Sequence, residues 1–444
     1  MKVSALPSDP GPAAWNELLP PAPLRESLNS TQQADWLVIG AGFTGLTAAR
    51  RLAELHPNDR IVVLDAKRVA DGPAGRNSGF MIDVPHVLTA SDYSGDINND
   101  HREIRLNRAG IAYATEIKQH YGMSDEALSL TGKINGAITQ RGVDHNLVYA
   151  KYLDSLAEPY EILDAAAMHA VTGIECYQQG LYTAGTAMLQ PAMYIRALAE
   201  GIESDKLRIY ENSPVITLDR NGELWQAQTP DGLLSAPRVI LSVNGHLESF
   251  GFYKRQLVHV YTYGSMTRAL TLNETEALGG QPRWALTPAD TLGTTVRRIS
   301  GVGGDRIIVR NRATFDPSLH VDEKRLNKIA LDHDRSFQYR FPQLATVDME
   351  YRWGGKLCLS RNNVNVFGEI DKNLFAACCQ NGLGTAKGTI SGKLIAELAC
   401  QMPSSLLEDQ LAGDAPNKLP PEPFASIGAT GLLRWGEFRA GKEL

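Results

Sequence analysis

The feature that most constrains this chain is a glycine-rich turn that joins a short apolar run to a helix. Residues 36–39 read WLVI, residues 40–45 read GAGFTG, and a second apolar run at 61–64 ends in Asp65. A strand, a glycine turn, a helix and a second strand ending in an acidic residue are typical of a βαβ unit that binds a dinucleotide. The alternative, a glycine-rich turn without a ligand, leaves this combination unexplained.

Each glycine of the turn has a separate task in such a unit. Gly40 permits the tight turn, Gly42 lets backbone N–H groups approach a diphosphate, and Gly45 lets the helix pack closely on the strand. Asp65 accepts hydrogen bonds from ribose hydroxyls, and its charge disfavours the 2′-phosphate of NADP. The expected dinucleotide-binding residues are Gly40, Gly42, Phe43, Thr44, Gly45, Asp65, Ala66 and Lys67.

The segment after the second strand bears on whether the dinucleotide is NAD or FAD. Residues 66–86 are rich in small side chains where an NAD domain would continue into another helix, and residues 75–79 read GRNSG. An ordinary polar loop is one interpretation. The stretch also resembles the G-A-S-G-x-N-x-G segment of the D-amino-acid-oxidase superfamily of FAD enzymes, in the branch of glycine, sarcosine and γ-glutamylputrescine-type oxidases. That resemblance implies flavin neighbours at Arg76, Asn77, Ser78 and Gly79.

Two later regions resemble the same family. A helix opening at Gln190-Pro191 precedes a short strand and Val215, whose backbone the resemblance places at the adenine. The run at 238–246 reads RVILSVNGH, and its end, at Asn244 and Gly245, resembles the family segment that closes the FAD site.

Residues 351–399 resemble the closing unit of the family, with a W-G-G, three strands, a glycine turn and a long helix. No second βαβ unit follows this turn, so we expect a single dinucleotide site. The N–H groups of the turn, with the charge of Lys387, would stabilise negative charge developing at flavin N1 and the C2 carbonyl. A surface lysine is the alternative for Lys387. The residues expected to contact the flavin here are Trp353, Gly382, Leu383, Gly384, Thr385, Ala386 and Lys387.

The expected substrate wall consists of two strands. Along residues 256–271, His259, Tyr261 and Tyr263 alternate onto one face and are expected to border the amine, with core packing as the alternative. The second strand, at 305–315, offers Arg310, and next Arg312, as the arginine that binds a substrate carboxylate, with an exposed strand edge as the alternative. The expected catalytic residues are therefore Lys387, Tyr261, His259 and Arg310.

Five cysteines in 444 residues show no metal-ligand spacing, so we expect reduced thiols and no metal. Cys378 and Cys379 would point to opposite faces of one strand. A cysteine in a strand comparable to that of Cys358 holds the flavin covalently in sarcosine oxidases, and a core cysteine is the alternative.

The remaining composition limits the partners and the location. A formal charge of −6 gives no reason to expect nucleic acid. No apolar run reaches the roughly 18–20 residues of a membrane span, and the first residues lack a secretory pattern, which together indicate a cytoplasmic protein.

The expected fold is mixed α/β, with a Rossmann-like FAD-binding domain and an antiparallel-sheet substrate domain. We expect an arm at 1–34, a FAD domain at 35–90, 181–250 and 346–403, a substrate domain at 91–180 and 251–345, and a tail at 404–444.

The resemblance implies FAD-dependent oxidation of a small-molecule amine or amino acid, of which secondary amines and N-substituted amino acids are plausible examples. Hydride would pass to flavin N5, and water would hydrolyse the imine product. Oxygen or another acceptor would take the electrons. The alternatives are a single-FAD monooxygenase that uses NAD(P)H and a flavin-binding subunit without its own turnover.

Overall fold

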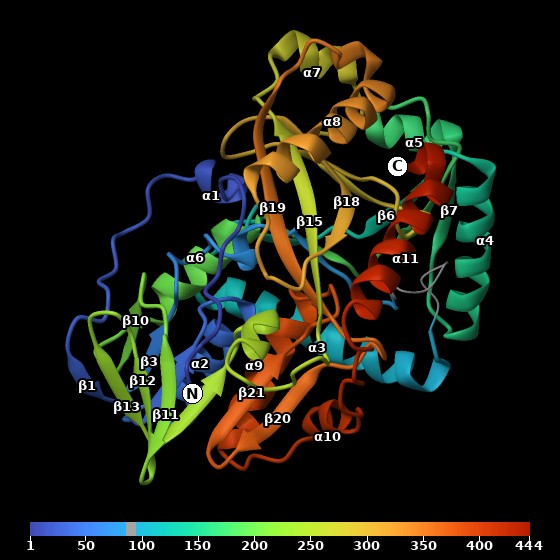
Figure 1. Ribbon diagram of the computed structural model, residues 1–444. Helices are drawn as coiled ribbons and strands as arrows, with labels where there is room; N and C mark the ends of the chain where they lie inside the picture. Colours follow the sequence, from blue (N-terminus) through green and yellow to red (C-terminus); the bar gives the residue numbers. More distant parts are fainter. Residues whose placement is uncertain (86–94) are drawn as a thin grey trace.

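The computed structural model describes residues 1–85 and 95–444, and two large sheets dominate it (Figure 1). The first sheet has the order β10-β3-β2-β14-β21-β20. Its neighbours are parallel except for the last pair, β21 and β20. The inner strands are apolar except for Arg238 at the start of β14, because both faces of the sheet are covered. The strands are β2 (Trp36–Ile39), β3 (Ile61–Leu64), β10 (Leu207–Tyr210), β14 (Arg238–Leu241), β20 (Val366–Asp371) and β21 (Leu374–Cys378).

Four helices pack around this sheet: α2 (Phe43–Leu55), α3 (Ile97–His120), α6 (Pro191–Ile202) and α9 (Ala386–Ala399). The helices α2 and α9 approach closely because Gly392 has no side chain; a Cβ there would lie 2.2 Å from the carbonyl oxygen of Thr44. The start of α6 is fixed by the Gln190 side chain, which accepts a hydrogen bond from Met193 N, and by Pro191 in the first turn.

The second sheet has the order β19-β15-β18-β17-β16-β6-β8-β7 and is antiparallel except at β16 and β6. Its strands are β6 (Lys133–Ala137), β7 (Glu161–Asp164), β8 (Gln179–Thr183), β15 (Val258–Thr267), β16 (Trp284–Pro288), β17 (Thr295–Ile299), β18 (Arg306–Phe315) and β19 (Met349–Leu359). The helices of this half are α4 (Gln140–Ser155), α5 (Ala165–Thr172), α7 (Leu272–Leu278), α8 (Glu323–Arg340) and α11 (Phe424–Ala440).

Smaller elements complete the molecule. One small sheet joins β1 (Thr31–Gln33), β13 (Leu233–Ala236), β12 (Leu224–Gln228) and β11 (Thr217–Asn221). Another joins β4 (Phe80–Met81), β9 (Ala187–Leu189) and β5 (Leu128–Leu130). The short helices α1 (Ala14–Glu17) and α10 (Ser405–Leu411) lie in the terminal segments.

The expected α/β fold with a mainly parallel sheet and a mainly antiparallel sheet is confirmed. The expected domain bounds stay a prediction, but two strands of the eight-stranded sheet do not follow them. Strand β8 crosses the expected bound between residues 180 and 181. Strand β19 lies in the segment assigned to the FAD domain, yet it pairs with β15 along its whole length in the eight-stranded sheet. The expected boundary between residues 90 and 91 falls outside the described residues. Within the described residues, no helix is long and apolar enough to cross a membrane.

Candidate functional site

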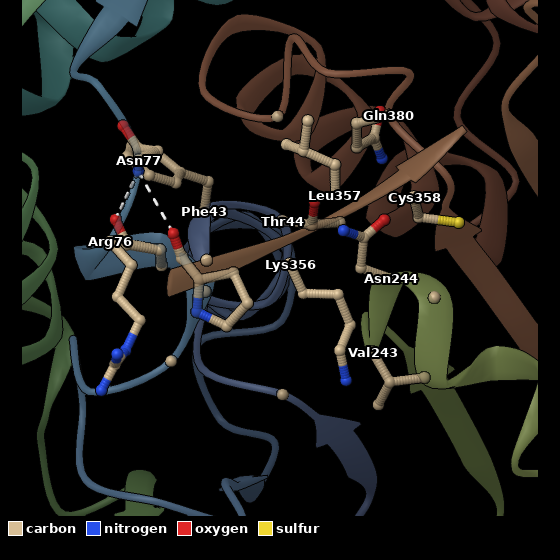
Figure 2. A pocket seen from close by; sticks show the side chains of 18 of the residues that line it. Phe43, Thr44, Arg76, Asn77, Val243, Asn244, Lys356, Leu357, Cys358 and Gln380 are labelled. Carbon is tan, nitrogen blue, oxygen red and sulfur yellow. Dashed lines mark hydrogen bonds between the residues drawn. The ribbon is translucent and has the colours of Figure 1, made fainter. Parts of the chain in front are cut away.

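One cavity of about 320 Å³ is lined by residues from both large sheets and from the N-terminal arm. Figure 2 shows that distant chain segments meet around it, near Phe43, Arg76, Val243 and Lys356. The following expected residues line it: Gly40, Gly42, Phe43, Thr44, Asp65, Ala66, Lys67, Arg76, Asn77, Ser78, Gly79, Val215, Asn244, Gly245, Arg310, Gly382, Leu383, Gly384 and Thr385.

The glycine turn forms one end of the cavity, and its geometry requires glycine at two positions. Gly40 has a φ of +106°, and a Cβ there would lie 2.7 Å from the carbonyl oxygen of Ser242. A Cβ at Gly45 would lie 1.7 Å from the carbonyl oxygen of Gly40, so Gly45 sets the contact between α2 and β2 and does not line the cavity. At Gly42 the nearest atom to a Cβ would be 3.6 Å away, which leaves an open cradle at the start of α2. This cradle fits a diphosphate.

Asp65 links the ends of β2 and β3. Its carboxylate accepts hydrogen bonds from Ala41 N at 2.7 Å and from Lys67 N at 2.8 Å. Burial raises the pKa of Asp65 to about 6, against the effect of these two hydrogen bonds. Its carboxyl group is thus oriented at the cavity wall, where a ribose would be held.

The N-terminal arm closes one side of the cavity, a feature that the sequence analysis did not anticipate. Residues 3, 5–7 and 9 belong to the lining. Asp9 is almost fully buried and pairs with Lys67 at 2.9 Å. The Arg76 guanidinium donates to the carbonyl oxygens of Pro10 and Gly11, at 3.1 and 3.0 Å. The arm is therefore fixed to the segments that flank the glycine turn.

The segment 76–79 lines the cavity while its polar side chains are engaged elsewhere. Asn77 Nδ2 donates to Ala74 O at 2.7 Å, and Asn77 Oδ1 accepts from Gly79 N at 2.8 Å. The buried guanidinium of Arg297 donates to Ser78 O at 2.6 Å, and burial lowers its pKa to about 9. These hydrogen bonds hold the segment in place, and Arg297 connects it to β17.

Asn244 joins the ends of two central strands. Its Oδ1 accepts a hydrogen bond from Cys379 N at 3.1 Å, which links the end of β14 to the end of β21. Val215 is buried and lines the same part of the cavity as Ser213.

The glycine-rich turn before α9 lines the cavity with residues 382–385, and the lining ends where α9 begins. Thr385 is held by its hydroxyl group, which donates to Phe80 O. Ala386 and Lys387 do not line the cavity, contrary to expectation. The ammonium group of Lys387 instead pairs with Glu103 of α3 at 2.9 Å, and the side chain is nearly buried there. Lys387 is the second residue of α9, and at this position its side chain points to α3 and away from the cavity.

Trp353 does not line the cavity either, although it was expected among the flavin-contacting residues. Its indole N–H donates to Arg76 O at 3.0 Å, and the ring lies over Gly264, where a Cβ would come within 2.8 Å of it. Trp353 therefore positions the segment that begins at Arg76.

The expected amine wall on β15 is on the wrong face of the strand. Tyr261 and Tyr263 pack in an apolar cluster against α8, and Tyr261 donates to the carbonyl oxygens of Ser8 and Leu319. His259 is bound to Glu248, with 2.6 Å between Nε2 and Oε2, and does not line the cavity. Thr262, which lies between Tyr261 and Tyr263 and points to the opposite face of β15, lines the cavity instead.

Of the two candidate arginines on β18, one lines the cavity and the other does not. Arg310 lines the cavity. Arg312 is the extra residue of a β-bulge, with a φ of +61°, because Thr262 pairs with Ala313 and Tyr263 with Asn311. Its guanidinium forms ion pairs at 2.8 Å with Asp332 and at 2.9 Å with Glu437. The expectation for Arg312 is therefore wrong, because the bulge turns its side chain away.

Several lining residues carry no motif and were missed. Four threonines line the cavity together with Arg310, namely Thr262, Thr287, Thr291 and Thr295, and Thr295 is the register partner of Arg310 between β17 and β18. On the arm side, Lys356 Nζ lies 2.8 Å from His246 Nε2, and burial lowers the pKa of Lys356 to about 8. The position of Lys356 directly after the W-G-G stretch was the one available signal.

The five cysteines are free thiols. Cys358 lines the cavity and is buried. A hydrogen bond with Cys379 and burial raise its pKa well above that of an ordinary thiol. Because the thiolate is the nucleophile, the structure favours a core cysteine over a site of covalent attachment.

Comparisons with known proteins agree with this geometry. The family model of FAD-dependent oxidoreductases called DAO matches residues 35–398. The probable oxidoreductase OrdL of Haemophilus influenzae is 23% identical over 389 residues, which cover 83% of this chain and 84% of that protein. The γ-glutamylputrescine oxidoreductase of Escherichia coli is 23% identical over 414 residues, with 90% and 89% coverage.

Solved structures show the same fold at low sequence identity. Glycine oxidase from Geobacillus kaustophilus superposes with a TM-score of 0.68 at 16% identity, over 86% of this chain and 99% of that chain. Iminodiacetate oxidase from Chelativorans sp. superposes with a TM-score of 0.65 at 16% identity, over 83% and 96%.

Proposed function

Because the chain belongs to the DAO family of FAD-dependent oxidoreductases, we propose that it oxidises the C–N bond of an amine or amino acid that carries a carboxylate. The observation that supports this proposal is the single cavity, which joins the glycine turn at Gly40 to Arg310 of the eight-stranded sheet. One enclosed space therefore offers a dinucleotide cradle and a cationic group for a small anionic substrate.

The cofactor end of the cavity suits FAD. Backbone N–H groups at the start of α2 are available to the diphosphate, and Asp65 is oriented toward a ribose. Residues 77–79 and 382–385 line the same cavity and would border the bound cofactor. When bound there, FAD supplies the two-electron acceptor for substrate oxidation.

The substrate end is lined by one guanidinium and several hydroxyl groups. Arg310 matches the two oxygens of a carboxylate, and the threonines that line the same cavity offer hydrogen bonds to an amine or a second polar group. Ile82 and Leu357 supply apolar wall, so a small substrate would be largely desolvated and held in one orientation.

Names of related proteins support an amine that carries a carboxylate. The relatives include a γ-glutamylputrescine oxidoreductase, a glycine oxidase and an iminodiacetate oxidase. Glycine and iminodiacetate contain both an amine and a carboxylate, and iminodiacetate is a secondary amine. We therefore place secondary amines and N-substituted amino acids first among the substrates. Water would hydrolyse the imine product, and oxygen or another acceptor would reoxidise the cofactor.

An anaerobic screen of the purified holoenzyme tests this proposal. Each carboxylated amine is compared with its decarboxylated analogue, and loss of the oxidised flavin absorbance is recorded. We expect bleaching by at least one carboxylated secondary amine and little by its analogue. Bleaching by NADPH without any amine would instead support a monooxygenase, and bleaching only by uncharged amines would contradict the role of Arg310.

A further inference from the structure

The outward side of α11 carries an unusual concentration of large apolar side chains. We call the five exposed residues Phe424, Ile427, Leu432, Trp435 and Phe438 the α11 apolar face. Each has 60–76% of its surface exposed, and the rings of Trp435 and Phe438 stack at 5.9 Å. The helix lies beyond residue 398, where the match to the family ends.

A neighbouring helix shows what an ordinary exposed surface looks like in this molecule. On α8, which packs on the same sheet, the exposed positions include Glu323, Lys324, Arg325, Lys328 and Arg335. Contiguous apolar patches on a protein surface mark interaction sites, whereas charged faces are solvated. The α11 apolar face therefore has the character of an interaction site.

The orientation of α11 is fixed, so the apolar face cannot turn inward. Glu437 on its inner side pairs with Arg312 at 2.9 Å and accepts from Ala313 N at 3.2 Å. Gly436 faces Leu292, where a Cβ would come within 2.3 Å of the leucine side chain. After the helix, the buried Glu443 carboxylate accepts hydrogen bonds from Ile138 N and Thr139 N, at 2.9 and 2.8 Å.

Small residues in the middle of the α11 apolar face favour a second helix as its partner. Among residues 1–85 and 95–444, nothing outside α11 itself lies within 4 Å of a Cβ at Gly428 or Gly431, so the middle of the face is a shallow gap. Small residues at a helix contact let a second helix approach closely. A lipid surface would instead favour a continuous apolar stripe.

We propose that the α11 apolar face is an interface between two copies of this chain, with the α11 helices antiparallel about a two-fold axis at Gly431. In a two-fold interface the same patch meets itself. Residues whose numbers are equally far from Gly431 then face each other, which pairs Phe424 with Phe438 and Ile427 with Trp435 across the axis.

Charge complementarity supports this antiparallel arrangement. It brings Arg439 of each copy beside Pro423 and Glu422 of the other, and both charged residues are exposed in the single chain. The apolar face also has a sufficient size. Aromatic side chains bury roughly 150–250 Å² each, so three aromatics and two aliphatics from each copy approach the ~1,000 Å² of a specific interface.

The test is the solution mass of the full-length holoenzyme, measured by sedimentation at micromolar concentration. We expect twice the mass of the chain for the natural protein and the single mass for a Trp435→Glu/Phe438→Glu variant with unchanged FAD content. The control Leu331→Glu, at an exposed position of α8, is expected to keep the double mass.

A Gly431→Cys variant tests the position of the axis. Mild oxidation is expected to cross-link it into a covalent dimer, whereas a Leu331→Cys control stays single. A monomeric natural protein, a dimer that survives the double substitution, or a failure of Gly431→Cys to cross-link would each overturn the proposal. Sedimentation of a monomer with anionic vesicles would identify a lipid surface as the occupant and also overturn it.

Discussion

The two ends of the cavity differ in what the chain contributes to them, which is mainly backbone at one end and side chains at the other. At the cofactor end, Gly40 and Gly42 contribute backbone, and the glycine turn and Asp65 lie within one short stretch of the sequence. At the substrate end, Thr262, Thr295 and Arg310 contribute side chains from three antiparallel strands. The first end depends on the absence of side chains, and the second depends on which face of a strand each side chain occupies.

The largest expected effect comes from adding one methyl group at the cofactor end. In Gly45→Ala, the new Cβ would lie 1.7 Å from the carbonyl oxygen of Gly40, so α2 must move away from β2. We expect FAD binding to be abolished, because the turn that holds the diphosphate is displaced. The cofactor content of the purified protein measures this.

The matched control is Gly72→Ala at the same end of the cavity. In the part of the chain that the structure describes, no atom beyond the neighbouring residues lies within 4 Å of a Cβ at Gly72. Its φ of −82° suits alanine, so FAD content should stay near that of the natural protein. Full occupancy in Gly45→Ala would contradict the account of the turn.

The second prediction concerns the substrate end alone. Arg310→Met should lower the apparent affinity for a carboxylated substrate, or its rate of flavin reduction, by about 100-fold, because a charge-assisted pair is lost. FAD content should not change. Rapid-mixing kinetics under anaerobic conditions provide the measurement.

Arg312→Met is the matched control on the same strand. It breaks the ion pairs with Asp332 and Glu437 and should lower thermal stability while leaving substrate affinity intact. If Arg312→Met weakened substrate binding more than Arg310→Met, the roles given to the two arginines would be reversed.

A smaller effect should appear in the pH dependence of FAD binding. The pKa of the Asp65 carboxyl group is raised from its ordinary value of 3.8 to about 6. In the folded apoprotein this group therefore stays protonated up to about pH 6. Ionisation above pH 6 therefore costs stability in the apoprotein, and ribose hydroxyls that donate to the carboxylate offset that cost. FAD affinity should rise by about tenfold from pH 5 to pH 7.

Fluorescence titration of the apoprotein with FAD measures this dependence. In Asp65→Asn the side chain does not titrate, so the affinity should be weaker and nearly flat over the same range. A rise that persists in Asp65→Asn would assign the dependence to another group.

The smallest expected effect concerns Lys387, which lies just outside the cavity. Since its ammonium group pairs with Glu103, Lys387→Met should change the rate of flavin reduction by less than about twofold. Glu103→Gln should behave in the same way, and both should show a modest loss of thermal stability. A large loss of reduction rate in Lys387→Met alone would restore the catalytic role that the resemblance implies.

Most residues expected at the cofactor end line the cavity, because the information that places them is local. Strand, glycine turn, helix and acidic residue occur within about thirty residues, and the turn itself depends on backbone geometry that glycine permits. The parallel sheet and the second, antiparallel sheet also follow from apolar runs and alternation.

The substrate end was predicted less well because its geometry depends on distant pairings. Alternation groups Tyr261 with Tyr263, but it does not say that α8 covers this face while Thr262 faces the cavity. The bulge at Arg312 depends on the register between β15 and β18. The arm residues near Asp9 reach the cavity through tertiary contacts, which no local pattern encodes.

The central claim is that one cavity serves both cofactor and substrate. The most direct test is to titrate the oxidised holoenzyme with a small carboxylate that has no oxidisable amine and to record the flavin spectrum. The account predicts a saturable spectral shift whose midpoint rises about 100-fold in Arg310→Met and stays unchanged in Arg312→Met. No spectral shift, or a shift that Arg310→Met leaves unaltered, would contradict a shared cavity.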